Sequence, residues 1–384
     1  MCDEGLKVLH VITGINVGGA ENHLLSLCRG LTSRGIDVSV AYLRADDDEL
    51  TSKFREAGCS VISVNMRHDA DPAALARLVK HARGAVYDIV HGHLFHGTVY
   101  GSVAAVACGS EFIVSKHNDH PFWADQPVKT VHELALKPVD RVICLSDYVR
   151  EYLLETTQVD PGLVETVHYG LDPTRFDEVS ASARRQIHRE FDTEEGFLVG
   201  TIGRLTEQKN LGILLRSFQE VVGEHPTAKL AVVGRGEEEE QLKALATKLG
   251  IDDHIIFTGF REDIPELMHA FDVFVLPSRW EGFGVVFLEA MAARTPVVAS
   301  DTSAIPEVIG TGEGTAGVLV DSDDTGAFAD TINRLLSDAE YRAELGDSGR
   351  ERLESRFSVP QMVEQIATIY SACTGKQRPS RAGP

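Results

Sequence analysis

Short apolar runs alternate with longer segments of helical periodicity along the whole chain. The first run covers residues 6–13; a glycine turn follows it, and a helix is expected over 20–33. Later apolar runs predict further strands at 38–43, 89–90, 112–114, 142–145 and 164–168. Strands that alternate with helices in this way indicate a parallel, doubly wound α/β sheet.

A second series of the same kind begins near Phe197. Its later strands are expected at 229–233, 255–257, 273–276 and 297–299. Between the two series, residues 169–173 break the pattern and are expected to begin an interdomain linker. The pattern therefore predicts two Rossmann-like domains, 1–172 and 173–356, facing each other across a cleft, with a frayed tail at 375–384.

Length and composition fit a two-domain cytoplasmic protein. A chain of 384 residues is too long for one ordinary core. There is neither a run of about 18 apolar residues nor a leader-like N-terminal pattern, so we expect no membrane-spanning helix and no secretory signal. The six cysteines contain no CxxC pair, which favours reduced thiols over a disulfide frame or a zinc ribbon.

The net charge of the chain argues against nucleic acid as a partner. The formal charge is −21, and acidic residues are in excess in both halves. Nucleic-acid binding depends on a basic surface that neutralises phosphates. We therefore expect no nucleic-acid partner.

A glycine-rich turn runs directly into an apolar helix start at residues 280–291. Glu281 precedes the expected helix, and Glu289 lies one to two turns inside it. Amides at a helix N-terminus suit a diphosphate, and Gly282 and Gly284 lack a Cβ that would keep a ligand away. An isolated glutamate pair is more often a solvated helix surface. The neighbouring motifs favour a site that holds a phosphorylated sugar.

Two cations, five positions apart, follow another expected strand. Arg204 and Lys209 come after the run at 198–203 and before a helix that begins near Leu211. Open α/β sheets bind ligands at the carboxyl ends of their strands, and arginine with lysine can neutralise a diphosphate. Either cation alone would be interpreted as a solvated loop charge. Together they predict an anion site.

Arg204, Lys209, Glu281 and Glu289 together resemble the donor site of retaining glycosyltransferases of family 4, a large GT-B family. The resemblance covers nearly the whole chain. It includes residues 18–21 (Gly-Gly-Ala-Glu), 88–93, 271–278, 296–299 and 305–308. The resemblance implies GT-B architecture, with a final helix over about 357–374 that crosses back to the first domain.

This resemblance implies a retaining glycosyltransferase that needs no cofactor and no obligatory divalent metal. A hexose-type sugar would move from a nucleoside diphosphate sugar to an acceptor hydroxyl, and the leaving phosphate would help to deprotonate the acceptor. A UDP-sugar is the favoured donor and a GDP-sugar the second. The acceptor would be a glycan, a lipid-linked sugar or a small molecule, in the synthesis of a polysaccharide, glycolipid or cell-envelope glycan.

The same resemblance assigns roles to individual residues. Arg204 and Lys209 would stabilise the leaving diphosphate. Glu281 would contact sugar hydroxyls, and Glu289 the ribose. His117 follows an apolar strand and resembles the first-domain histidine that points at the donor sugar. The donor contacts would come from Gly18, Gly19, Arg204, Lys209, Glu281, Gly282, Phe283, Gly284, Val285 and Glu289, and the catalytic roles would fall to His117, Arg204, Lys209 and Glu281.

Metal binding is the less favoured interpretation of the remaining polar clusters. His91, His93 and His96 lie close together, but their spacing matches no familiar zinc site and no cysteine is near. Most of these imidazoles are expected to be structural. The acidic clusters at 46–48 and 323–324 are expected to be solvated loops, so no metal ligands are assigned.

A basic amphipathic segment raises the alternative of a membrane surface. Residues 73–83 place Leu75, Leu78, Val79 and Ala82 at helical spacing among basic residues. A helix that packs its apolar stripe on the first domain's sheet shows the same pattern. Membrane contact is therefore expected to be at most peripheral, at the inner face of the cell membrane.

Three departures from the family pattern bear on donor and acceptor choice: Tyr169 stands where Asn is common, Arg294 where a small residue is usual, and 304–305 where glycines are usual. Among rival classes, a dehydrogenase is disfavoured because residues 14–19 lack the GxGxxG spacing. A sugar-nucleotide epimerase and a non-catalytic sugar-nucleotide-binding protein remain as alternatives. Product analysis separates them.

Overall fold

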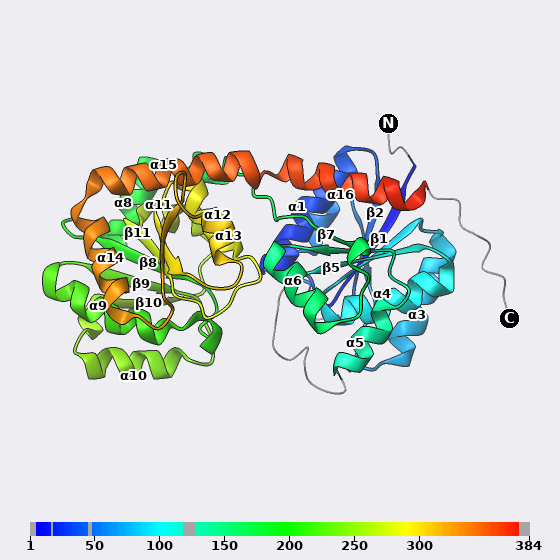
Figure 1. Ribbon diagram of the computed structural model, residues 1–384, viewed down its shortest axis with the longest axis horizontal. Coiled ribbons are helices and arrows are strands. Elements are labelled where there is room, and N and C mark those ends of the chain that lie inside the picture. Colours follow the sequence, from blue (N-terminus) through cyan, green and yellow to red (C-terminus); the bar gives the residue numbers. More distant parts are fainter. Residues whose placement is uncertain (1–4, 17, 45–47, 118–127, 376–384) are drawn as a thin grey trace. The chain divides into compact units, whose positions relative to one another are not determined.

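Figure 1 shows the computed structural model of the chain, which describes residues 5–16, 18–44, 48–117 and 128–375. The chain divides into two compact units. Unit 1 consists of Met1–Gly170 together with Val359–Pro384, and unit 2 is Leu171–Ser358. The division falls at 170/171, two residues before the boundary expected from the linker.

Unit 1 is built on a seven-stranded parallel sheet with the strand order β3-β2-β1-β4-β5-β6-β7. Its strands are β1 Lys7–Ile12, β2 Asp37–Tyr42, β3 Ser60–Ser63, β4 Ile89–His93, β5 Glu111–Lys116, β6 Arg141–Cys144 and β7 Val164–Thr166. Its helices are α1 Gly19–Ser33, α2 Thr51–Glu56, α3 Pro72–Ala85, α4 Leu94–Cys108, α5 Val128–Leu136, α6 Asp147–Thr156 and α16 Val359–Thr374, with a 3₁₀ turn at Pro161–Leu163.

Both faces of this sheet are covered, which explains the near-continuous apolar run of β1. Val8 and Ile12 point into a core shared with α1 and α16. Leu9 and Val11 point into the opposite core, shared with α3, α4 and α6. His10 has the same strand parity as Val8 and Ile12, and it is fully buried.

Unit 2 contains a six-stranded parallel sheet with the order β10-β9-β8-β11-β12-β13. Its strands are β8 Leu198–Ile202, β9 Lys229–Val233, β10 Ile255–Gly259, β11 Val273–Leu276, β12 Val297–Ser300 and β13 Gly317–Val320. Its helices are α7 Thr174–Asp177, α8 Ala181–Glu190, α9 Leu211–Glu224, α10 Glu239–Leu249, α11 Ile264–Ala270, α12 Val285–Ala292, α13 Ile305–Ile309, α14 Thr325–Ser337 and α15 Ala339–Arg356, with 3₁₀ turns at Glu207–Lys209 and Asp252–His254. Two parallel-sheet Rossmann-like units confirm the predicted fold class.

The strand order of each sheet reverses next to its first strand. In unit 1 the reversal lies between β1 and β4, and in unit 2 between β8 and β11. Loops leaving two such strands diverge to opposite faces of the sheet, so the carboxyl ends of the strands open a crevice that commonly binds ligands. The candidate residues of unit 2 follow β8 and β11, and Gly18 and Gly19 follow β1, whereas His117 follows β5, the strand next to β4.

The basic amphipathic helix packs against its own unit. In α3, Leu78 and Ala82 are buried in the core. The guanidinium groups of Arg77 and Arg83 donate to backbone carbonyls of unit 1. The apolar stripe is therefore used for folding, and no described helix is long and apolar enough to cross a membrane.

Candidate active site

Lys209 and Glu281 form an ion pair in unit 2, in which Glu281 is buried and Lys209 is half-buried. Lys209 ends the 3₁₀ turn after β8, and Glu281 lies in the loop after β11. Lys209 Nζ donates a hydrogen bond to Glu281 Oε1, and the two side chains are only 14% and 8% exposed. Ser278 Oγ donates to the same oxygen at 2.7 Å. Oε1 is thus held by the protein, whereas Oε2 of Glu281 receives no hydrogen bond from the described residues.

Further hydrogen bonds tie the surrounding loops together. Gln208 Nε2 donates to the carbonyl oxygen of Trp280, and the Arg279 amide donates to the carbonyl of Gln208, both at 2.8 Å. The Glu281 amide donates to Ser303 Oγ, also at 2.8 Å. The loops after β8, β11 and β12 are therefore joined around Glu281, at the strand-order reversal of unit 2.

Arg204 presents an exposed charge close in sequence to this pair. Its side chain is exposed, and no described residue forms an ion pair or hydrogen bond with its guanidinium. The preceding residue is packed tightly, because a Cβ on Gly234 would lie 1.9 Å from the Gly203 carbonyl oxygen. The backbone before Arg204 is thus fixed while its guanidinium is available to an anion.

The glycine turn before α12 has the geometry that the sequence indicated. Gly284 caps the helix with a φ of +82°, and a Cβ there would lie 2.6 Å from the ring of Phe287. The first amides of a helix have no carbonyl partner within it, so the turn offers donors to a ligand. Phe283 is buried edge-on against Phe357, at 5.6 Å between ring centroids, so its side chain belongs to the core and only its backbone can face a ligand.

Glu289 lies on the second turn of α12. It is half-buried, and no described residue donates a hydrogen bond to its carboxylate. Loss of water around the group raises its pKa to about 7, while the charge of Arg175 acts in the opposite direction. A carboxyl in this state readily pairs with a ligand hydroxyl.

Within unit 1, His117 is linked to a chain of hydrogen-bonded side chains. His117 Nδ1 lies 2.6 Å from Tyr169 Oη, and His117 Nε2 lies 3.1 Å from His93 Nδ1. His93 Nε2 lies 2.9 Å from His10 Nδ1. Burial, with a smaller contribution from the charge of Lys116, lowers the pKa of His117 to about 3, so the ring is neutral at physiological pH. Both of its nitrogens are engaged inside unit 1.

A second set of contacts surrounds His91. Its Nδ1 lies 2.6 Å from Tyr370 Oη, and its Nε2 lies 2.8 Å from Ser115 Oγ. One ring nitrogen from each of His10, His91 and His93 lies within 4.8 Å of the others, as a three-histidine metal site would require. The lone pairs and N–H groups of His91 and His93 are already used in hydrogen bonds. The residues therefore form a hydrogen-bonded network, in agreement with the structural role expected for His91.

The first-domain glycines lie where β1 leads into α1. Gly18 caps α1 with an extended backbone, and its carbonyl accepts from Asn22. Gly19, the first residue of the helix, is exposed. Their backbone is therefore open to a ligand at the strand-order reversal of unit 1.

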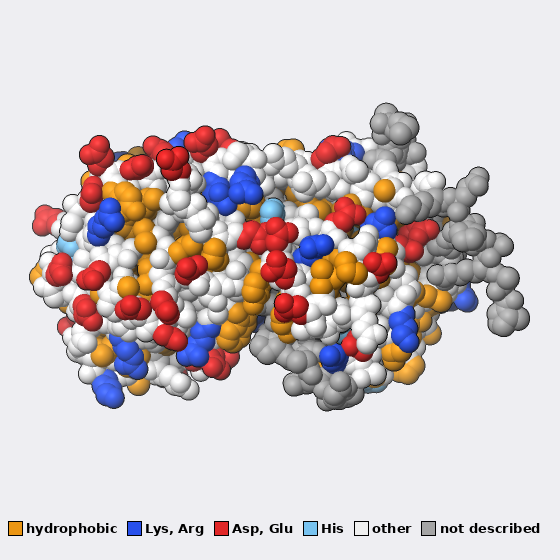
Figure 2. All heavy atoms as spheres, viewed as in Figure 1, with side chains coloured by type: hydrophobic (Ala, Val, Ile, Leu, Met, Phe, Trp, Pro, Cys, Tyr) orange, Lys and Arg blue, Asp and Glu red, His pale blue; other side chains and the backbone are white. Residues whose placement is uncertain are grey.

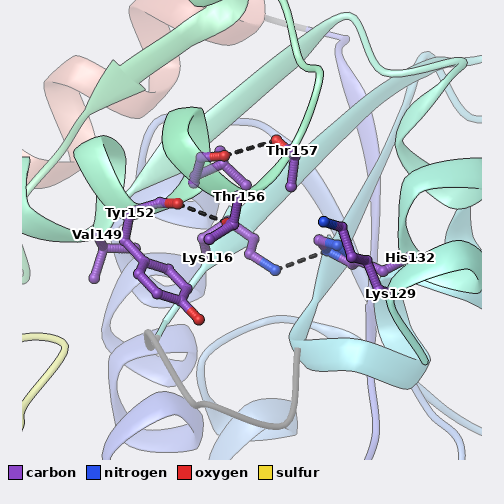
Figure 3. A pocket seen from close by; sticks show the side chains of 8 residues that line it. Lys116, Lys129, His132, Val149, Tyr152, Thr156 and Thr157 are labelled. Atoms are coloured by element: carbon purple, nitrogen blue, oxygen red, sulfur yellow. Dashed lines mark hydrogen bonds between the residues drawn. The ribbon is translucent and has the colours of Figure 1, made fainter. Parts of the chain in front are cut away.

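A small cavity lies beside Lys116, at the end of β5 (Figure 3). Lys116 Nζ points at His132 Nε2, 2.8 Å away, and burial lowers the pKa of Lys116 to about 7. The cavity has a volume of about 20 Å³, enough for roughly one water molecule. It is too small for a sugar or a nucleotide, and all the residues that line it belong to unit 1.

The sequence does not indicate that His93 and Tyr169 are partners of His117, or that His10 is a partner of His93. In the sequence, His10 belongs to an apolar strand, and Tyr169 stands out only as a departure from the family pattern at the linker. The parity of His10 and His93 with buried neighbours on adjacent strands could have suggested that they meet, because His10 pairs in register with His91.

On the face shown in Figure 2, acidic side chains are spread among fewer basic ones, and the described residues form no continuous basic surface there.

Two protein families match the chain. Residues 17–175 match the family described as Glycosyltransferase Family 4. Residues 183–352 match the family described as Glycosyl transferases group 1. The first match lies almost wholly in unit 1 and the second within unit 2.

Individual relatives agree with these matches. The putative glycosyltransferase EpsD of Bacillus subtilis is 33% identical over 301 residues, which cover 74% of this chain and 77% of the relative. A D-inositol 3-phosphate glycosyltransferase of Acidothermus cellulolyticus is 30% identical over 399 residues, covering 94% of this chain and 87% of the relative.

Among solved structures, Anabaena Alr3699/HepE in complex with UDP-glucose superposes with a TM-score of 0.84. The match covers 96% of this chain and 100% of the other, at 23% sequence identity. At that identity the likeness shows a shared fold.

Proposed function

Because this chain belongs to glycosyltransferase family 4 and the second half of the chain matches the group 1 glycosyl transferases, we propose that it transfers a hexose-type sugar from a nucleoside diphosphate sugar to an acceptor hydroxyl. We further propose that the anomeric configuration is retained and that UDP-sugars are preferred to GDP-sugars. The observation that carries the proposal is the preformed cluster in unit 2. It combines an exposed arginine, an ion pair between a half-buried lysine and a buried glutamate, and a glycine-capped helix start, all in the loops that follow β8 and β11.

Each part of this cluster has a role in the reaction. Breaking the sugar–phosphate bond places negative charge on the leaving oxygen, which Arg204, Lys209 and the amides at the start of α12 would stabilise. Lys209 is held by Glu281, so little reorganisation is needed when the diphosphate arrives. Glu281 Oε2 remains available for sugar hydroxyls, and Glu289 would bind the ribose.

A base must take the proton of the acceptor hydroxyl, and the leaving phosphate oxygen is chemically suited to do so. It gains negative charge as the sugar becomes oxocarbenium-like, on the face from which a retaining acceptor approaches. His117 would stand beside the sugar as a neutral group.

The first prediction concerns the nucleotide. In a thermal-shift panel of UDP, GDP, ADP and their glucose conjugates, we expect the uridine compounds to stabilise the chain most. Ligand at about 100 times its Kd adds roughly 2.7 kcal/mol to the free energy of unfolding. HepE was solved with UDP-glucose, which motivates the order. A clear preference for GDP or ADP would contradict the uridine assignment, and no shift with any of them would contradict the donor site.

The second prediction concerns the product. An α-linked nucleotide sugar should give an α-glycoside, which the coupling constant of the anomeric proton reports by NMR. A β product would exclude the retaining mechanism. Conversion of the donor without acceptor would instead favour an epimerase, and tight binding without any product would favour a sugar-nucleotide sensor.

The third prediction is that turnover survives EDTA. The acidic cluster at 323–324 has a structural use, because Asp324 caps α14 by accepting from the Ala327 amide. Of the other cluster, residues 46 and 47 lie outside the described part of the chain. Loss of activity on chelation, restored by Mn²⁺ or Mg²⁺, would show that the donor diphosphate is bound through a metal.

We propose a glycan, lipid-linked or small-molecule acceptor and a cytoplasmic site of action, with membrane contact that is at most peripheral. The packing of α3 against unit 1 supports this view, since its apolar stripe is not available to a bilayer.

A further inference from the structure

Four side chains in unit 1 form one continuous hydrogen-bonded chain. It runs from His10 on β1 through His93 at the end of β4 and His117 after β5 to Tyr169 beyond β7. Its three links measure 2.9, 3.1 and 2.6 Å. Each link joins two groups that can donate or accept, so one choice of proton position fixes all the others.

The inner end of the chain decides its direction. His10 Nε2 is buried and has no partner among the described residues. If Tyr169 donated inward, to His117 Nδ1, then His117 and His93 would each be protonated on Nε2 and donate to the next ring. His10 would then accept at Nδ1 and carry its proton on Nε2, as a buried N–H without an acceptor. If His10 donates outward from Nδ1, Nε2 carries only a lone pair. Unpaired buried N–H groups are the rarer defect, so the outward direction is favoured.

The outward direction specifies the tautomer of His117. His93 Nδ1–H then donates to His117 Nε2, and His117 Nδ1–H donates to Tyr169 Oη. We infer that His10, His93 and Tyr169 are positioning residues that hold His117 as a neutral ring protonated on Nδ1. This inference rests on the proposed function in one respect only, namely that His117 stands beside the donor sugar.

A chemical consequence follows for the reaction. Because the Nε2 lone pair already accepts from His93, His117 has no free nitrogen with which to take a proton. This excludes His117 as the base and agrees with the proposed loss of the acceptor proton to the leaving phosphate oxygen, in which the new glycosidic C–O bond forms, the sugar–phosphate bond breaks, and the proton ends on the released diphosphate. His117 contributes a fixed shape and a neutral charge.

Nitrogen-15 NMR on the histidine-labelled full chain tests the tautomer directly. We expect His117, assigned by comparison with His117→Gln, to show a protonated Nδ1 and an unprotonated Nε2 between pH 6 and 8. Tyr169→Phe removes the acceptor of the Nδ1 proton and should shift the ring towards the Nε2-protonated form. A wild-type His117 protonated on Nε2, or on both nitrogens, would overturn the inference.

Tyr87→Phe is the matched control. Tyr87 is 7% exposed and Tyr169 is 4% exposed. Tyr87 Oη also lies 3.0 Å from a histidine nitrogen, His81 Nε2, but neither residue belongs to the hydrogen-bonded series from His10 to Tyr169. We expect Tyr169→Phe to lower kcat about five- to tenfold with less than a twofold change in KM for the nucleotide sugar, as the loss of one hydrogen bond implies. Tyr87→Phe should leave both values unchanged. Equal kcat values for the two variants would count against a positioning role.

A second pair of variants keeps the test usable if Tyr169→Phe folds poorly. In His93→Asn the amide nitrogen can replace Nδ1 as the donor to His117, whereas in His93→Leu it cannot. The Asn variant should recover the Nδ1-protonated signal and most of kcat, and the Leu variant neither. If the two variants behave identically, His93 does not hold His117 in the Nδ1-protonated form. Absence of sugar transfer by the wild-type protein would contradict only the proposed function, because the NMR comparison still decides the tautomer.

Discussion

Unit 1 is expected to lose most of its stability between pH 7 and pH 5. Five neighbouring histidines of this unit are held neutral, because burial lowers the pKa of each below the usual 6.5; for His10 and His117 it falls to about 3. In the unfolded chain the same rings take up protons below about pH 6.5. Unfolding is therefore favoured as the pH falls, and the effect grows until the pH reaches the folded pKa values. The five residues are His10, His23, His91, His93 and His117.

The expected magnitude is large for a single domain. At pH 5.5 each such ring disfavours folding by about 1.4 kcal/mol, or roughly 7 kcal/mol for five, against a typical total stability of about 5–15 kcal/mol. Urea unfolding at pH 7.5, 6.5 and 5.5 measures the free energy of unfolding, and hydrogen exchange identifies which of the two units unfolds. His23 has no hydrogen-bond partner on either ring nitrogen among the described residues.

Because His23 has no such hydrogen bond to lose, His23→Phe should remove about a fifth of the contribution that these five rings make to the pH dependence. His68→Phe, at an exposed position in the same unit, should leave it unchanged. If the stability of unit 1 is the same at pH 7.5 and 5.5, the rings are not held neutral.

The second large effect is expected for Lys209→Ala, which should damage both folding and activity. Removing the ammonium leaves the Glu281 carboxylate buried without its charge partner, and breaking a buried pair on one side costs about 3–5 kcal/mol. The same change removes a cation from the leaving diphosphate. A lost charge-assisted hydrogen bond costs about 1.5–3 kcal/mol, or roughly tenfold or more in kcat/KM.

Arg204→Ala separates these two effects. The exposed guanidinium has no protein partner among the described residues, so the variant should lose about tenfold or more in kcat/KM while keeping its melting temperature. A Lys209→Met/Glu281→Gln double variant should regain stability over Lys209→Ala, because no uncompensated charge remains, but it should stay inactive. Wild-type kinetics in either single variant would remove that residue from the donor site.

The alternation of apolar runs and helices was sufficient to predict the fold class, because most strands buried on both faces contain an apolar run. In β4, which is buried throughout, that run is only Ile89 and Val90, and His91, Gly92 and His93 complete the strand. The two strands not predicted, β3 and β13, are edge strands in which several side chains are half-buried or exposed. Their apolar runs are correspondingly short. At a sheet edge, pairing on one side is enough to hold a strand without a long hydrophobic signature.

The candidate residues of unit 2 could be selected from the sequence because glycines, cations and carboxylates stand close together in two short segments. The contact of Lys209 with Glu281 was not predictable, since 72 positions separate them and only the adjacency of β8 and β11 brings them together. The partners of His117 were hidden for the same reason. Histidines on three different strands become one network only when the order of the sheet is known.

The last helix affects the order in which the chain can fold during translation. Met362, Val363, Ile366 and Tyr370 on α16 complete the core of unit 1, and a Cβ at Gly30 on α1 would lie 2.3 Å from Val363. The 188 residues of unit 2 separate this helix from the rest of unit 1. At about 5–20 residues per second, the ribosome needs roughly 10–40 s to make them. During that interval the nascent first sheet has one face without its final cover, so unit 2, a continuous segment, can finish folding first.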